Sequence, residues 1–202
     1  MQKTTPKNKG YSLIEVLVAI AILMMSIVGP LTIAAKSIQT AQYARQQTTA
    51  FFLAQEAISA LEAVHHRRTL MVLGGTGSDS WFDFKSGVGS ALQTCFASAG
   101  CDIVRTTTSA LNAIRACNAG ASPNPCTLRL ADPATYTTDA ILYSHLAGGA
   151  ITPYTRTVTL TPMANTDEVL VTVVVAWPTK LLGGSTQNVT LRTSFFNTYK
   201  NF

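Results

Sequence analysis

The chain has 202 residues, of which 47% are hydrophobic and only 12% are charged, so a disordered or highly charged polypeptide is excluded. The charged fraction is about half of the ~25% that is usual in soluble domains. The net charge of +5 does not indicate a nucleic-acid binder, because Lys3, Lys7 and Lys9 carry much of it. From position 11 onward, twelve basic residues stand against ten acidic ones.

An uncharged apolar run occupies residues 16–35, with the sequence VLVAIAILMMSIVGPLTIAA. As a helix it would be about 30 Å long, the thickness of the hydrocarbon core of a bilayer. The lysines before it predict a cytoplasmic N-terminus and an exported remainder. Three interpretations compete: a cleaved secretory signal, a simple membrane anchor and a more specialised segment. The run is longer than the apolar region of about 7–15 residues in a secretory signal.

Glu15 lies one residue before this run, within the apolar sequence YSLIEVLVAIAIL. An acid at membrane depth costs about 2.5–3.5 kcal/mol, so a simple anchor is not expected to carry one. The alternative is that Glu15 lies at the interface and is merely solvated. A short basic leader that ends in Gly10, followed by Tyr11 and then by Glu15 and the long apolar run, favours the specialised segment.

The segment GYSLIEVLVAI, residues 10–20, resembles the cleavage and methylation motif of the type IV prepilin family. The resemblance covers about eleven residues, and the first mature residue is Tyr11 where the family more often has Phe. It implies that prepilin peptidase cuts between Gly10 and Tyr11 on the cytoplasmic side and methylates the new Tyr11 amine. The apolar helix would then remain in the mature protein, where other pilin or pseudopilin subunits and the membrane assembly platform are the implied partners.

A physical role for Glu15 follows from this cleavage. Gly10 offers a backbone without a side chain at the bond to be cut. The new amine at Tyr11 lies one helical turn from Glu15. In a filament, the buried carboxylate could pair with the amine of an adjacent subunit, and the low dielectric would strengthen the pair. We therefore expect Glu15 to set the register of assembly.

A long helix is expected to continue through residues 36–73, since residues 36–70 contain no Gly or Pro and are rich in Ala, Gln, Leu and Ile. Gly74 and Gly75 are expected to end it. Within residues 11–35, Gly29 and Pro30 predict a kink or a local opening, as in type IV pilins with a similarly placed Gly or Pro. Three- and four-residue spacing predicts that one apolar stripe packs on a C-terminal sheet; it consists of Phe51, Ala54, Ile58, Leu61 and His65.

Residues 74–150 are expected to be rich in loops, with short helical pieces at 87–96 and 108–117. All four cysteines lie here, and an even number of cysteines in an exported segment predicts two disulfides. Pairing of Cys95 with Cys101 and of Cys117 with Cys126 is favoured among the three possible pairings, because it closes two small loops. Zinc binding is disfavoured because the cysteine spacings lack a short C-x₂₋₄-C pair.

Residues 151–202 read as an antiparallel sheet. Residues 154–161 and 189–195 alternate in polarity, and residues 168–177 are rich in β-branched side chains. Pro178 and a Gly183-Gly184 turn separate the last two strands. The expected fold class is α+β, with a long N-terminal helix packed on a C-terminal antiparallel β-meander. The strand sequences VTVVVAWP and NVTLRTSFF also resemble the ending of pilins of the minor pilin V and pseudopilin I group.

No constellation of catalytic residues, metal ligands or cofactor motif is found in the sequence. The residues His65-His66-Arg67-Arg68 are interpreted as a solvated cationic end of the helix. The aromatic side chains of Trp81, Phe82 and Phe84 are interpreted as anchors of the loop region on the core.

The expected protein, with the leader at 1–10, is not an enzyme and needs no cofactor. It is a single-pass protein of the cytoplasmic membrane with an exported C-terminal head, in contact with lipid before it assembles and located at the cell surface or in the periplasm afterwards. The expected function is that of a minor pilin or pseudopilin of a type IV pilus. Alternatives are a type II secretion pseudopilin, a pilus-borne adhesin or DNA-uptake subunit, and an anchored protein with a conventional signal.

Overall fold

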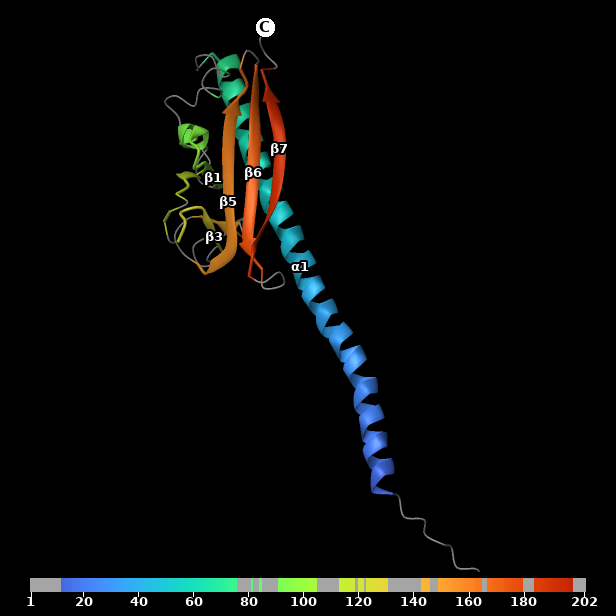
Figure 1. Ribbon diagram of the computed structural model, residues 1–202. Helices are drawn as coiled ribbons and strands as arrows, with labels where there is room; N and C mark the ends of the chain where they lie inside the picture. Colours follow the sequence, from blue (N-terminus) through green and yellow to red (C-terminus); the bar gives the residue numbers. More distant parts are fainter. Residues whose placement is uncertain are drawn as a thin grey trace, which may run out of the picture. The chain divides into compact units, whose positions relative to one another are not determined.

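The computed structural model divides the chain into two units, Met1–Ala44 and Arg45–Phe202. The second unit is called the head below. It contains the second half of a long helix, α1, and all of the strands (Figure 1). The structure describes residues 12–75, 81, 84, 91–104, 113–118, 120–121, 123–130, 143–145, 149–164, 167–179 and 184–197. The elements are α1 (Leu13–Leu73), the 3₁₀ helix η1 (Ala91–Phe96), β1 (Cys101–Val104), β2 (Ala113–Ala116), β3 (Thr127–Leu130), β4 (Tyr143–Ser144), β5 (Ile151–Pro162), β6 (Glu168–Pro178) and β7 (Thr186–Phe196).

The helix α1 begins and ends at residues suited to those positions. The carbonyl oxygen of Ser12 accepts hydrogen bonds from the amides of Glu15 and Val16, at 3.0 and 3.3 Å, so Ser12 is the N-cap. At the other end, the amide of Gly74 donates to the carbonyl of Leu70 at 2.9 Å, and Gly75 has a φ of 71°. Glycine adopts this left-handed conformation without steric cost, which explains why the helix ends here.

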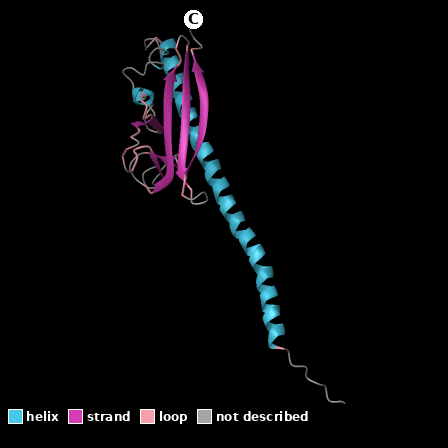
Figure 2. Ribbon diagram, viewed as in Figure 1, coloured by secondary structure: helices cyan, strands magenta, loops and turns pink. Residues whose placement is uncertain are grey.

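The sheet has seven strands, and every pairing is antiparallel (Figure 2). One edge of β5 pairs with β6, which pairs in turn with β7 over residues 168–178 and 186–196. The other edge of β5 pairs with β1 at Val158 and with β3 at Thr155 and Ile151. The strands β2 and β4 extend the sheet beyond β1 and β3. The expected α+β class and the meander of three C-terminal strands are therefore confirmed.

One face of the β5–β6–β7 part of the sheet packs on residues 45–73 of α1. Side chains alternate between buried and half-buried along β6, and the inward residues Val169, Val171, Val173, Val175 and Trp177 are at most 1% exposed. Arg156 of β5 donates to the Leu53 carbonyl and to the Glu56 side chain of α1, and Phe195 of β7 contacts the ring of His65, so this buried face is the one that α1 covers.

The stripe by which α1 contacts the sheet differs from the predicted one. Ala54, Leu61 and His65 are buried as expected, but Phe51 is 41% exposed and Ile58 is only half-buried. The predicted stripe included the large side chains of Phe51 and Ile58, whereas alanines make up much of the buried face of α1. The buried residues of α1 are Ala50, Leu53, Ala54, Ala57, Ala60, Leu61, His65 and Thr69.

The region 74–150, expected to be rich in loops, contributes four short strands and η1. The expected helical piece at 87–96 is present over residues 91–96, which form η1. Residues 87–90 lie outside the described ones. The piece expected at 108–117 is wrong at residues 113–116, which form β2; residues 108–112 lie outside the described part. Pairing of β2 with β1 outweighs the weak local helix preference of this segment.

Candidate functional site

Glu15 lies in the first turn of α1, three residues after the N-cap Ser12. This spacing is that of a capping box, in which an acid or an amide at the third helical position complements the cap. An acid here also interacts favourably with the positive end of the helix dipole. Glu15 thus has a local role in the helix in addition to any role in assembly.

The apolar first part of α1 has no protein cover within this chain. Every residue from Leu13 to Ala35 is exposed, and Leu13 and Met25 reach 78% and 79%. Among the described residues, α1 is the one helix whose length and composition suit a membrane span; its most apolar window has a mean hydropathy of 2.5. A single long apolar helix of this kind is compatible with a membrane-anchored protein.

Pro30 lies inside α1, which is helical on both sides of it. Proline has no N–H to donate to the carbonyl four residues earlier, so one backbone hydrogen bond is missing there. The hydroxyl of Thr32 donates to the carbonyl of Gly29 at 2.8 Å, a side-chain bond within this stretch. A kink or local opening at Gly29 and Pro30 stays a prediction. The expected cleavage position between Gly10 and Tyr11 lies outside the described residues.

A second candidate site is a buried cluster of charges in the head. Arg156 on β5 donates from Nε to Asp102 Oδ1 on β1 at 2.6 Å, and the other carboxylate oxygen of Asp102 contacts His145 Nδ1 at 2.6 Å. Arg156 and Asp102 are 0% exposed and His145 is 2% exposed. This set of three residues is called the buried triad below.

The guanidinium of Arg156 also joins the sheet to the helix. Its Nη1 donates to the carbonyl of Leu53 on α1 at 3.0 Å and to Glu56 Oε2 at 3.2 Å, while its Nη2 donates to the carbonyl of Ile103 at 2.8 Å. Arg156 therefore ties β5 to β1 and to the second half of α1 with one side chain.

Opposite charges keep Asp102 and Arg156 of the buried triad ionised. Burial alone raises the pKa of Asp102, but the charge of Arg156 and the hydrogen bonds from His145 and Arg156 outweigh it and hold that pKa below its ordinary value. Burial lowers the pKa of Arg156, but Asp102 and Glu56 outweigh this effect and raise it. The triad therefore contains a carboxylate and a guanidinium that are both charged in the core.

Gly100 and the disulfides hold β1 in the position that the triad requires. Gly100 has a φ of 68°, and a Cβ added there would lie 2.7 Å from both Thr157 Cγ2 and Val158 O of β5. Only glycine allows β1 to start this close to β5. The cysteines pair by nearest neighbours: Cys95 is joined to Cys101, the first residue of β1, and Cys117, just after β2, is joined to Cys126, just before β3.

Removing either disulfide should lower the stability of the head. The two disulfides join cysteines 6 and 9 residues apart in the sequence. Closing a loop of this size lowers the entropy of the unfolded chain, which raises the free energy of unfolding by about 2–3 kcal/mol for each disulfide. The measurement is urea unfolding of a Cys117→Ser/Cys126→Ser variant in detergent micelles, followed by tryptophan fluorescence. The matched Cys95→Ser/Cys101→Ser variant should show a loss of similar size, and unchanged midpoints in both would contradict the prediction.

The predicted cationic end of the helix is only partly solvated. His66 is exposed, but His65 is 8% exposed and lies within ring-contact distance of Trp81, Phe84 and Phe195, with centroids 5.0–5.8 Å apart. Burial, and next the neighbouring His66, lower the pKa of His65, so it is packed as a neutral ring. His65 belongs to the core, and its inclusion in a solvated cluster was wrong.

The predicted aromatic anchors are confirmed where the structure describes them. Trp81 is 6% exposed and Phe84 is 0% exposed, and both pack on His65. Phe82 lies outside the described residues. In the part of the chain that the structure describes, no group of three or more His, Cys, Asp or Glu side chains is placed to hold a metal ion.

The buried triad could not be predicted from the sequence as a set of three residues, although one of its members carries a signal. Along β5 the residues at even positions from 152 to 160 are buried, so the period-two pattern alone places Arg156 on the inner face. A cation at an inward position of a strand requires a buried acid partner. Asp102 and His145 have no such local signal, because they lie 54 and 11 residues away from Arg156 along the chain.

Comparison with known proteins identifies the N-terminal segment. The prokaryotic N-terminal methylation motif, the signal of type IV pilins and pseudopilins, matches residues 5–29. No curated protein and no solved structure matches the chain. The motif supports a protein of the type IV pilin-like or pseudopilin class, whose members are structural subunits rather than enzymes.

Proposed function

We propose that this chain is a minor pilin or pseudopilin that prepilin peptidase processes after Gly10 and that is then assembled into the helical filament of a type IV pilus. The match of residues 5–29 to the methylation motif carries the proposal. The exposed apolar segment of α1 supports it, because such a surface needs lipid before assembly and neighbouring subunits after it.

The basic leader orients the chain in the cytoplasmic membrane. Lys3, Lys7 and Lys9 keep the N-terminus in the cytoplasm, so that the head is exported. The two disulfides of the head suit an oxidising compartment outside the cytoplasm. Assembly at the membrane platform would then carry the head to the periplasm or the cell surface.

The mature protein should begin at a methylated Tyr11. Cleavage at this bond removes the basic leader but keeps Glu15 and the whole of α1. The measurement is the intact mass and N-terminal sequence of the protein from its native membrane. A chain that begins near Lys36 would show ordinary secretion and contradict the proposal.

A related candidate function is that of a pseudopilin of a type II secretion system, which has the same signal. Detection of the mature protein in sheared surface filaments would favour the pilus, whereas a secretion defect in a deletion strain without loss of filaments would favour the pseudopilus. An adhesin or DNA-uptake subunit would add a binding surface on the head to the same leader.

A further inference from the structure

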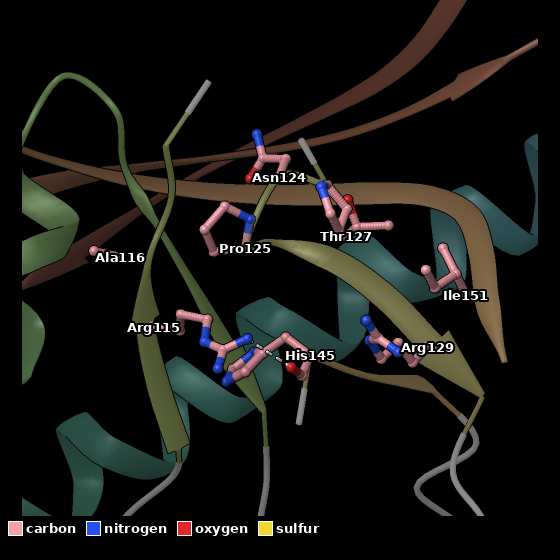
Figure 3. Close-up of a pocket in the computed structure, with 9 residues that line it drawn as sticks. Arg115, Ala116, Asn124, Pro125, Thr127, Arg129, His145 and Ile151 are labelled. Carbon is pink, nitrogen blue, oxygen red and sulfur yellow. Dashed lines mark hydrogen bonds between the residues drawn. The ribbon is translucent and has the colours of Figure 1, made fainter. Parts of the chain in front are cut away.

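A cavity of about 500 Å³ lies on the head beside the buried triad (Figure 3). Arg115 on β2 and Arg129 on β3 flank it, and His145 lies between them. The other described residues that line the cavity are uncharged and include Asn124, Thr127 and Ile151.

The charges that the described residues bring to this cavity are all of one sign. Arg115 donates one N–H to the carbonyl of His145 at 3.0 Å, and no other described residue takes one of its remaining donors. Arg129 makes no ion pair within the described part of the chain. None of the described residues that line the cavity is acidic, and the carboxylate behind it, that of Asp102, is fully buried and already bound by Arg156 and His145.

We propose that this cavity binds an oxyanion group, a carboxylate or a phosphate, between Arg115 and Arg129. A guanidinium presents paired N–H donors in a planar fork that matches both groups. Asn124 also lines the cavity, and its Oδ1 accepts a hydrogen bond from the amide of Cys126 at 2.9 Å. Among the described residues, the cavity thus offers charged donors and no competing carboxylate.

The volume of the cavity and the residues that line it restrict the kinds of molecule whose oxyanion group could bind there. A volume of about 500 Å³ is within the range of ~300–1,000 Å³ typical of small-ligand pockets. None of the described lining residues is aromatic, so they offer bases no stacking platform, which disfavours single-stranded nucleic acid. A discrete acidic group at the end of a sugar, a peptide or a small metabolite fits better. The inference does not depend on the proposed role in a filament.

The test is calorimetric titration of the full chain in uncharged detergent with inorganic phosphate and, separately, with succinate, at constant ionic strength set by chloride. We expect saturable binding of at least one probe. Arg115→Gln and Arg129→Gln should each weaken it at least about tenfold, because each removes charge-assisted hydrogen bonds. Stronger binding of phosphate would indicate a phosphate-bearing ligand, and stronger binding of succinate a carboxylate-bearing one; both results support the proposal.

The matched control is Arg192→Gln, an exposed arginine on β7 that does not line the cavity, which should leave binding unchanged. An equal loss in this control would show general attraction to surface charge and overturn the proposal, as would the absence of saturable binding of both probes. If Arg115→Gln fails to fold, the Arg129→Gln variant tests the proposal by itself. This variant is expected to fold, because Arg129 makes no ion pair in the described structure. The Arg129→Lys variant keeps the charge but loses the fork, so an intermediate affinity is expected.

Discussion

Replacing Arg156 by methionine should lower the free energy of unfolding of the head by about 3–5 kcal/mol, since it leaves the carboxylate of Asp102 charged, buried and without its main partner. It also removes the hydrogen bonds to the carbonyls of Leu53 and Ile103. The measurement is urea unfolding of the full chain in detergent micelles. The buried Trp177 reports the transition of the sheet.

Three comparisons separate the triad from general effects of substitution. Arg192→Met on the exposed side of β7 should change the stability by no more than about 0.5 kcal/mol. Glu56→Gln should cost at most about 1 kcal/mol, because Glu56 is 33% exposed and water screens its pair with Arg156. An Arg156→Met/Asp102→Leu double variant should lose less than the sum of the two single variants, since the one charge that it leaves without its partner, that of Glu56, is partly exposed rather than fully buried. A loss below about 1 kcal/mol in Arg156→Met alone would show that the triad does not hold the head together.

The elements that local patterns define could be predicted from the sequence. The long helix follows from an uninterrupted helix-forming composition and a glycine pair at its end, and β5–β7 follow from alternation and β-branched residues. The face of α1 that contacts the sheet was harder to predict from the sequence. Its contact with the sheet uses alanines such as Ala54 and Ala57, whose small size matters only once the sheet lies opposite.

The short strands of the middle region could not be predicted because distant residues define them. The strands β1–β4 have two to four residues each, too few for a periodic pattern, and pairing with β5 and two disulfides hold them. The two candidate sites differ from each other for the same reason. The Glu15 motif is contiguous and therefore visible in the sequence, whereas Asp102 and His145 are 43 residues apart and meet only in the folded head.

In the proposed filament, replacing Glu15 by glutamine should reduce incorporation of the chain at least about tenfold, because the amine that we expect to pair with it in the neighbouring subunit would lack a buried partner. Glutamine is the informative replacement. It serves in a capping box as well as glutamate does, so the helix start at Ser12 is kept while the charge is removed. The measurement is the amount of the variant in sheared filaments relative to the amount in the membrane.

A defect in membrane insertion cannot account for reduced incorporation of Glu15→Gln into filaments. Removing an acid from the edge of the apolar run lowers the cost of insertion, so the amount of Glu15→Gln in the membrane should not fall. Glu62→Gln, the same substitution at an exposed position of α1 in the head, should assemble normally. Glu15→Ala removes both the charge and the capping-box side chain. Reduced assembly of Glu15→Ala with normal assembly of Glu15→Gln would therefore assign Glu15 to the helix start alone. Normal assembly of both variants would show that the acid has no part in holding the subunits in register.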